Sequence, residues 1–221
     1  MMTISENLFK IKSKLPKEVI LVAVSKTKPV SNIMEAYTTG HRIFGENKIQ
    51  EMAAKHEEMP KDIEWHMIGH IQRNKVKYMA SFVSLIHAVD SFRLLTEINK
   101  QALKNNRVIN CLLQIKIASE ESKFGLTEVD AKYLMNSEGF KSFQNIKIVG
   151  LMGMATFTDN KEQLQKEFGM LKKVFNKFRI QNSEFRILSM GMSDDYPIAI
   201  KNGSTMMRVG SSIFGKRNYN L

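Results

Sequence analysis

The feature that most constrains the fold of this chain is a regular alternation of strand-like and helix-like segments. Short apolar runs rich in β-branched residues are separated by longer segments with helical periodicity. In KEQLQKEFGMLKKVF, for example, Leu164, Phe168 and Leu171 fall on one helical face. The strand-like runs are residues 19–25, 43–45, 63–69, 83–89, 109–118, 146–155, 185–192 and 206–213.

Strands that alternate with helices form right-handed β–α–β units and a parallel sheet. Eight such strands predict a (β/α)8 barrel, a fold usually built from about 250 residues. An open doubly wound sheet is the alternative. Its nucleotide-binding loops, G-x-G-x-x-G and G-x-x-x-x-G-K-[ST], follow none of the predicted strands, which favours the barrel. We therefore expect residues 1–221 to form a single α/β barrel domain with an extra N-terminal helix.

The net charge of +11 comes from 33 Lys and Arg against 22 Asp and Glu. Such an excess can indicate a nucleic-acid partner. Here the lysines are spread over amphipathic stretches such as QRNKVKYM and LKKVFNKFR, and no zinc-finger or RNA-recognition motif is present. A solvated basic surface is therefore favoured over nucleic-acid binding. The same charge also suits a small anionic ligand.

Two features bear on the cellular compartment. No apolar run approaches the roughly 20 residues of a membrane span, and the N-terminal segment is polar and helical in pattern rather than signal-like. Cys111 is the one cysteine, so no intramolecular disulfide can form, and its place within an apolar strand predicts a buried, inert thiol. We expect a cytoplasmic protein that does not associate with a membrane.

Lys26 follows the strand-like run LVAVS and is the first candidate for a functional residue. Taken alone, a lysine at a strand end is more often a solvated surface residue. In a (β/α)8 barrel, however, the carboxyl ends of the strands form the active-site face. An amine held in that mouth is partly desolvated and close to other cations, which makes it nucleophilic. Lys26 is therefore expected to form a Schiff base with an aldehyde ligand.

An aldehyde cofactor that carries a phosphate also needs an anion-binding site at the same end of the barrel, where the strands have their carboxyl ends. In MRVGSSIFG, Gly210 allows close approach of the main chain, and Ser211 and Ser212 offer hydroxyl groups. SMGMSDD offers the same chemistry after the seventh strand, and loops seven and eight commonly bind phosphate in barrels. The other polar or glycine-rich strand ends include Asn47, His66, His70, Asp90, residues 152–154, Ser193 and Arg208.

Seven motifs of this chain resemble those of the pyridoxal-phosphate homeostasis protein family, also called the YggS or PROSC family. They are AVSKTKP, FGENKIQE, WHMIGHIQRNK, SKFGL, GLMGMA, LSMGMSDD and GSTMMRVGSSIFG. The matches run in the family's order from about residue 21 to residue 219. No single motif is specific, but the whole set is.

This resemblance implies a barrel like the N-terminal domain of alanine racemase, with pyridoxal 5′-phosphate (PLP) held as a Schiff base by Lys26. It also implies that Arg208 faces the pyridine nitrogen of the cofactor. The implied phosphate contacts are Ser193, Gly210 and Ser211, and the residues implied to line the ring are Asn47 and Met152.

Two positions depart from the family pattern. Ser211 stands where threonine is more common, which keeps the hydroxyl group. His70 stands where the family usually has proline in IGPLQ, which leaves the details of that loop open. A solvated position is the expectation for Lys123 in SKFG, with a second amine in the mouth as the alternative.

We expect structural rather than catalytic roles for the histidines. His66 follows Trp65 in a predicted strand and is expected to be packed and hydrogen-bonded. His66 and His70 have the spacing of a helical metal pair, but their segment is a predicted strand and turn without a following carboxylate, so no metal site is expected. His87 has no partner that the sequence can identify.

Arg208 bears on whether the protein is an enzyme. A permanently charged guanidinium opposite the ring nitrogen disfavours the pyridinium form and weakens PLP as an electron sink. A racemase needs, in addition, a second acid/base group, which in alanine racemase comes from a second, β-rich domain of the partner subunit. The eighth predicted strand lies close to Leu221, the last residue of this sequence, so we expect no such domain.

We therefore expect a non-catalytic protein that carries, buffers or delivers PLP, with no catalytic residues of its own. Apo forms of PLP-dependent enzymes are the candidate recipients, and a monomer is expected. The main alternative is a PLP-dependent amino-acid racemase or decarboxylase of narrow substrate range. A nucleic-acid-associated protein is a weaker alternative that rests on net charge alone.

Overall fold

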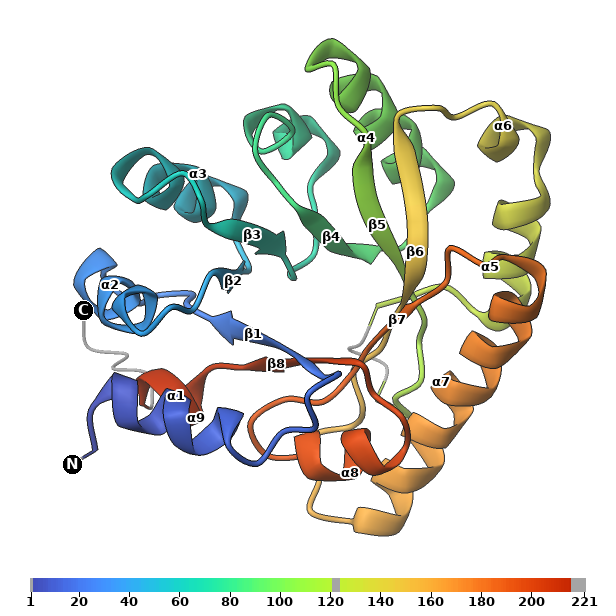
Figure 1. The fold of residues 1–221 in the computed structure, drawn as a ribbon. Helices are drawn as coiled ribbons and strands as arrows, with labels where there is room; N and C mark the ends of the chain where they lie inside the picture. Colours follow the sequence, from blue (N-terminus) through green and yellow to red (C-terminus); the bar gives the residue numbers. More distant parts are fainter. Residues whose placement is uncertain (1, 121–123, 216–221) are drawn as a thin grey trace.

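The computed structural model describes residues 2–120 and 124–215. These residues form a closed barrel of parallel strands in the order β1 to β8, with helices around the outside (Figure 1). This is the predicted (β/α)8 barrel. Its strands are β1 (Ile20–Val24), β2 (Ile43–Glu46), β3 (Glu64–Met67), β4 (Leu85–Val89), β5 (Ile109–Gln114), β6 (Ile146–Met152), β7 (Ile187–Ser189) and β8 (Met206–Val209).

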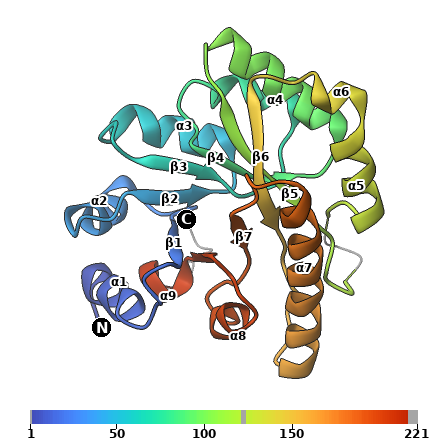
Figure 2. The same ribbon diagram turned by 45° about the vertical axis from the view of Figure 1, so that its right-hand side comes forward.

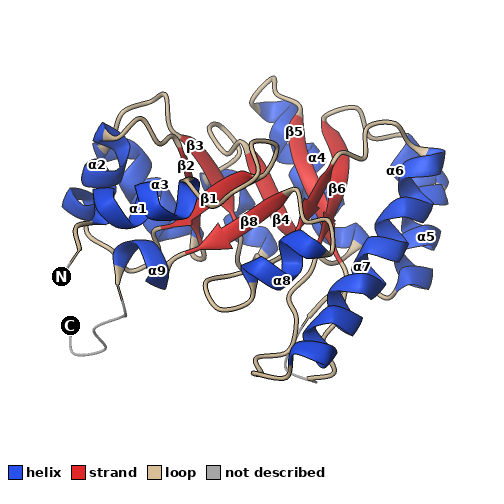
Figure 3. Ribbon diagram, turned by 60° about the horizontal axis from the view of Figure 1, so that its bottom comes forward, coloured by secondary structure: helices blue, strands red, loops and turns tan. Residues whose placement is uncertain are grey.

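Helices follow the strands and cover the outer surface of the sheet (Figures 2 and 3). The expected extra N-terminal helix precedes β1 and begins with a capping box between Thr3 and Glu6. No helix formed by the described residues has both the length and the apolar character required to cross a membrane. The helices are α1 (Ile4–Lys12), α2 (Val30–Thr38), α3 (Ile49–Glu58), the 3-10 helix η1 (Arg73–Tyr78), α4 (Phe92–Lys104), α5 (Glu128–Asn136), α6 (Glu138–Lys141), α7 (Lys161–Gln181), α8 (Tyr196–Lys201) and α9 (Ser211–Phe214).

The barrel closes where the first strand pairs with the last. β1 and β8 are parallel, and their register places Leu21 beside Met207 and Ala23 beside Val209. Figure 1 shows these strands side by side, β1 in blue and β8 in red. Because all strands point the same way, the residues that follow β1 and β8 reach the same rim of the barrel.

Side chains that alternate along the strands form two packed layers. The outer layer lies between the sheet and the helices and includes the largest fully buried side chains, among them Trp65, Phe44, Phe168 and Phe175. The inner layer fills the barrel with Val22, Leu85, Ala88, Leu112, Val149, Met152 and Met206. These apolar side chains fill much of the interior, and the space open to a ligand lies at the rim.

Every predicted strand is present, but several end earlier than the apolar runs indicate. The run 109–118 leaves the strand after Gln114, and the run 206–213 leaves it after Val209. Several of the extra residues are apolar because the loops at the rim are themselves packed; Ile117, for example, is buried. At these positions an apolar residue therefore indicates that the chain is buried, and does not indicate that it forms a strand.

Candidate functional site

A cavity of about 650 Å³ opens at the rim where the carboxyl ends of the strands meet. Its wall includes residues that follow β1, β2 and β3 and residues that follow β6, β7 and β8. The structure thus brings an amine, a guanidinium and two hydroxyl groups into one space. Of the seven residues predicted to bind the cofactor, six line this cavity: Lys26, Asn47, Ser193, Arg208, Gly210 and Ser211.

Met152 is the predicted residue that the structure does not bring into the cavity wall. It is fully buried in the inner layer of the barrel, where it packs with residues such as Leu112 and Val149. Met154, two positions further along the chain, lines the cavity instead. In a strand, residues two apart face the same way, so Met154 occupies the next level toward the rim.

Lys26 lies in a tight turn just beyond β1. The N–H of Lys28 donates to the carbonyl oxygen of Ser25 over 3.0 Å and closes this turn. Thr27, its third residue, has a φ of +63°, a left-handed conformation that β-branched residues rarely adopt. The turn places the half-buried side chain of Lys26 in the wall of the cavity.

Arg208 lies on β8 and is only 4% exposed, although it borders the cavity. Its guanidinium donates to the carbonyl oxygen of Ser189 at 3.0 Å, to Ser189 Oγ at 2.6 Å and to the carbonyl oxygen of Gly153 at 3.0 Å. Burial lowers the pKa of Arg208 to about 10, with the Asp195 carboxylate opposing the shift. That pKa remains above physiological pH, so the guanidinium is charged and held in one orientation.

Two histidines extend the contacts of Arg208 into the barrel interior. His87 Nδ1 lies 3.1 Å from Ser189 Oγ, and His87 Nε2 lies 3.1 Å from His66 Nδ1. Because arginine only donates, Ser189 Oγ accepts from Arg208. Burial lowers the pKa of both histidines, that of His66 to about 3, so both are neutral.

This chain of hydrogen bonds could not be identified from the sequence. His66 was expected to be packed and hydrogen-bonded, as the structure confirms, but the sequence identified no partner for His87. The sequence signal for this chain of hydrogen bonds was the alternation of side chains between the two faces of each strand. This alternation assigns inward-facing positions to His66, His87, Ser189 and Arg208. Strand registers decide which inward residues meet, and these come from the folded barrel. Neither histidine lines the cavity, and the chain of hydrogen bonds reaches the cavity wall at Arg208.

The loops after β7 and β8 are joined beside the cavity. The N–H of Gly210 donates to Ser193 Oγ over 3.3 Å, and Ser211 begins α9. Gly210 also packs tightly against β1, since a Cβ atom there would lie 3.2 Å from the carbonyl oxygen of Val24. The hydroxyl groups of Ser193 and Ser211 therefore belong to one part of the cavity, as donors for an anionic ligand.

Gly69 fixes the main chain of Asn47 at the cavity, because a Cβ atom on Gly69 would lie 2.4 Å from the Asn47 carbonyl oxygen. We expect Gly69→Ala to lower the free energy of unfolding by about 1–3 kcal/mol, the usual cost of overpacking. Gly169→Ala in α7 is the control, since the added Cβ would meet only Asn202 Oδ1, at 3.7 Å. Denaturant unfolding compares the two variants, and an unchanged stability of Gly69→Ala would contradict the close contact.

His70 and Phe124 lie at the outer part of the cavity wall. His70 Nδ1 is 3.2 Å from Asp90 Oδ2, and the imidazole stacks on Phe124 with ring centroids 5.1 Å apart. The loop that departs from the family pattern is therefore anchored by side-chain contacts of His70. Lys123, the candidate second amine, lies outside the described residues.

Comparisons with known proteins agree over almost the whole chain. Residues 1–218 match the family model of the alanine racemase N-terminal domain. A pyridoxal phosphate homeostasis protein of Aquifex aeolicus is 39% identical over 201 residues, which cover 90% of this chain and 87% of that protein. The corresponding protein of Haemophilus influenzae is 38% identical over 204 residues, which cover 90% of this chain and 85% of that protein.

Solved structures show the same likeness. PipY of Synechococcus elongatus, solved without PLP, superimposes with a TM-score of 0.90 at 34% identity, and the match covers 96% of this chain and 100% of that chain. PipY solved with PLP bound gives a TM-score of 0.87 with the same coverage. An alanine racemase of Clostridium difficile gives 0.80 at 14% identity and is covered over 58% of its length. That similarity demonstrates the barrel fold alone.

Proposed function

The chain belongs to the family of pyridoxal phosphate homeostasis proteins, and from this premise we propose that it binds PLP and maintains the cell's supply of this cofactor. The proposal rests on one observation above all: Lys26, Arg208 and Ser211, from the two ends of the chain, line a single cavity. PipY, which is 34% identical, has been solved with PLP bound. We place this activity in the cytoplasm, where the buried thiol of Cys111 stays reduced.

The chemistry of the cavity matches the groups that PLP presents. PLP carries an aldehyde, a ring nitrogen that accepts hydrogen bonds and an anionic phosphate. An amine, a guanidinium and hydroxyl groups are the respective complements of these three groups. The volume of about 650 Å³ lies within the range of small-molecule sites. PLP therefore fits both the size and the donor set of the cavity.

In this proposal, the anchoring residues come from the first and last strands. Lys26 holds the cofactor as a Schiff base, and Ser193, Gly210 and Ser211 bind its phosphate. The hydrogen bond between Gly210 and Ser193 keeps the two phosphate-binding loops at a fixed spacing. Bound PLP supplies an aldehyde that condenses with amines and a ring that withdraws electrons from the attached carbon.

The residues around the ring determine its electronic state. Arg208 faces the ring nitrogen as a fixed, charged donor, and Asn47 lines the ring. Met154 occupies the position at the cavity wall that sequence analysis assigned to Met152. A charged guanidinium at the nitrogen keeps that nitrogen unprotonated, which weakens electron withdrawal by the ring.

We propose on this basis that the protein carries PLP without turning over a substrate. The described histidines closest to Arg208 through hydrogen bonds, His66 and His87, are neutral, buried and outside the cavity wall. These two histidines are therefore not positioned to exchange a proton with a bound amino acid. His70 does line the cavity, where its Nδ1 lies 3.2 Å from Asp90 Oδ2 and its ring stacks on Phe124. Apo forms of PLP-dependent enzymes are the proposed recipients, and the proposed carrier is a monomer.

The phosphate-binding loops provide a direct test of the proposal. Pyridoxal, which lacks the phosphate, should bind far more weakly than PLP, and Ser193→Ala should weaken PLP binding about 10- to 100-fold. These factors correspond to losing one hydrogen bond to a charged group, roughly 1.5–3 kcal/mol. Pyridoxal binding should change little in this variant. Titrations followed by absorbance measure both ligands, with Ser81→Ala, an exposed serine away from the cavity, as the control.

Equal affinity of the wild-type protein for pyridoxal and PLP would show that no phosphate site exists in these loops. Equal losses of both ligands in Ser193→Ala would assign Ser193 a structural role only.

A further inference from the structure

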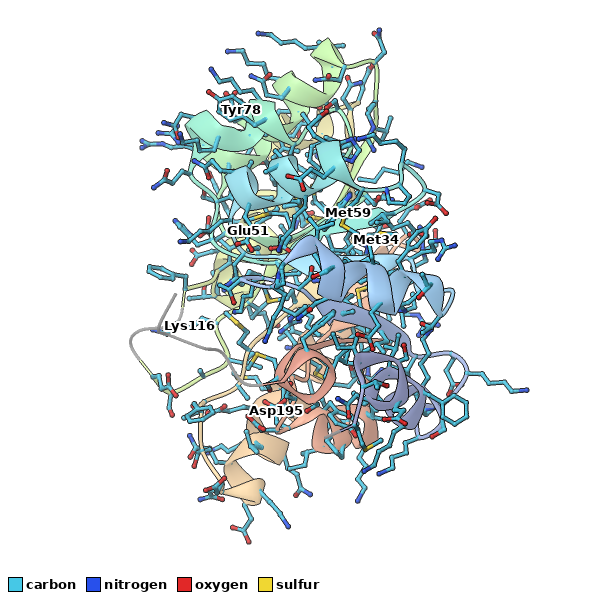
Figure 4. All side chains as sticks on the ribbon, turned by 90° about the vertical axis from the view of Figure 1, so that its left-hand side faces the viewer. Met34, Glu51, Met59, Tyr78, Lys116 and Asp195 are labelled. Carbon is cyan, nitrogen blue, oxygen red and sulfur yellow. The ribbon has the colours of Figure 1, made fainter. Side chains whose placement is uncertain are left out.

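A group of charged side chains lies beneath the turn that carries Lys26, with Glu46 and Lys55 buried and the Glu51 side chain 24% exposed. Glu46 at the end of β2 is completely buried, and the Lys55 side chain on α3 is 8% exposed. Lys55 Nζ donates to Glu46 Oε1 at 2.8 Å and to Glu51 Oε1 at 2.7 Å. Figure 4 views the molecule from the side that carries α3 and labels Glu51. None of these three residues lines the cavity, so the group lies behind Lys26 rather than beside a ligand.

Two members of this group hold the main chain on both sides of Lys26. Lys55 Nζ donates to the carbonyl oxygen of Ser25 at 2.9 Å, and the N–H of Thr27 donates to Glu51 Oε1 at 2.6 Å. Since Lys55 and Glu51 are also paired, the contacts form a continuous path from the residue before Lys26 to the residue after it.

The conformation of Thr27 requires stabilisation by contacts such as these. Its φ of +63° is unfavourable for a β-branched residue, and such conformations persist only where surrounding contacts enforce them. A carboxylate that accepts the Thr27 N–H is a strong contact of this kind, because charge-assisted hydrogen bonds are shorter and stronger than neutral ones.

The composition of the group also indicates a geometric role. Buried ion pairs contribute little net stability, and well-packed apolar residues stabilise a protein equally well or better. Apolar residues could not bind the main-chain groups that flank Lys26. The ionic residues are therefore suited to fixing a backbone conformation, and not only to filling the space beneath α3.

We propose that Glu51 and Lys55 are positioning residues that fix the turn at Lys26 and thereby direct its amine into the cavity. This inference rests on the proposed function, in which that amine joins an aldehyde. The reaction forms a C–N double bond, releases the aldehyde oxygen as water and involves no oxidation. Its rate depends on how the amine is held, because small misplacements of a reacting group cost up to about 100-fold.

The test compares Glu51→Ala with Glu58→Ala, which removes the same charge from an exposed position at the end of the same helix. The first ligand is PLP, and the rate of appearance of the imine absorbance is measured. The second is 4′-deoxypyridoxine 5′-phosphate, which has the ring and phosphate but no aldehyde, and its affinity is measured by calorimetry.

Glu51→Ala should slow imine formation about tenfold or more and leave the affinity for the deoxy analogue within about twofold of the wild-type value. Glu51→Gln, whose amide oxygen can still accept from Thr27, should recover part of the rate. Glu58→Ala should match the wild type with both ligands.

A wild-type rate of imine formation in Glu51→Ala would overturn the inference. So would equal losses for both ligands, or a failure of both Glu51 variants to fold, since these results would assign Glu51 to general support of the structure. The absence of an imine on Lys26 in the wild-type protein would instead reject the proposed function itself.

Discussion

Mixed with PLP, a Lys26→Ala variant is expected to show no visible imine absorbance and to bind the cofactor about 100-fold more weakly than the wild type, a difference of about 2.7 kcal/mol. Alanine supplies no amine, so only the contacts to the phosphate and the ring remain. After borohydride reduction, peptide mapping of the wild-type protein should find a pyridoxyl group on Lys26. The variant should carry no such group.

Lys147→Ala is the matched control for this experiment. Lys147 is an exposed lysine near the start of β6, at the end of the barrel opposite the cavity. Its removal should change neither the absorbance nor the affinity. A pyridoxyl label on a different lysine of the wild-type protein, such as Lys28 in the cavity wall or Lys123, would contradict the assignment to Lys26.

Arg208→Glu is expected to increase the reactivity of bound PLP toward amino acids. A carboxylate opposite the ring nitrogen favours its protonation, which strengthens electron withdrawal from the attached carbon. Exchange of the α-proton of L-amino acids in deuterated water should therefore rise about tenfold or more over the wild type. In the wild type, exchange should stay near background, without racemisation. NMR follows the exchange, with PLP at saturation because the new negative charge weakens phosphate binding.

Arg208→Gln separates the effect of charge from the loss of packing. Its amide group can still donate to the Ser189 carbonyl oxygen, whereas a glutamate at this buried position would face two carbonyl oxygens. Both variants should therefore be checked for folding by circular dichroism before exchange is measured. Wild-type exchange at about 1 per second, a typical enzymatic rate, would overturn the carrier proposal and favour the racemase or decarboxylase alternative.

The barrel was predictable because its signal is spread over the whole chain. Each β–α unit repeats the change from a short apolar run to helical periodicity, so an uncertain boundary in one unit does not alter the fold. Sequence analysis did not identify η1 or α8, for local reasons. Helix α8 is short and carries Pro197 in its first turn, where proline is tolerated. Helix η1 is a 3-10 helix, which lacks the usual α-helical period.

The candidate site was predictable only in part. Lys26 follows from the rule that barrels bind ligands at the carboxyl ends of their strands, and the Gly-Ser-Ser turn follows from the same rule. The rule does not say which residue near a strand end faces the cavity. Residues 152–154 were all expected at the end of their strand, and the family resemblance implied that Met152 lines the ring, whereas Met154 lines the cavity. The links of Lys26 to Glu51 and of Arg208 to His87 are contacts between distant segments, which one sequence does not reveal.

The seam between β1 and β8 has a consequence for how the protein is made. Lys26 follows the first strand and Ser211 follows the last, so their shared cavity exists only after the two strands have paired. A chain emerging from the ribosome presents Lys26 early and the loops proposed to bind phosphate last. A ligand that contacts both segments binds only after β1 and β8 have paired, and it therefore stabilises the closed barrel by mass action.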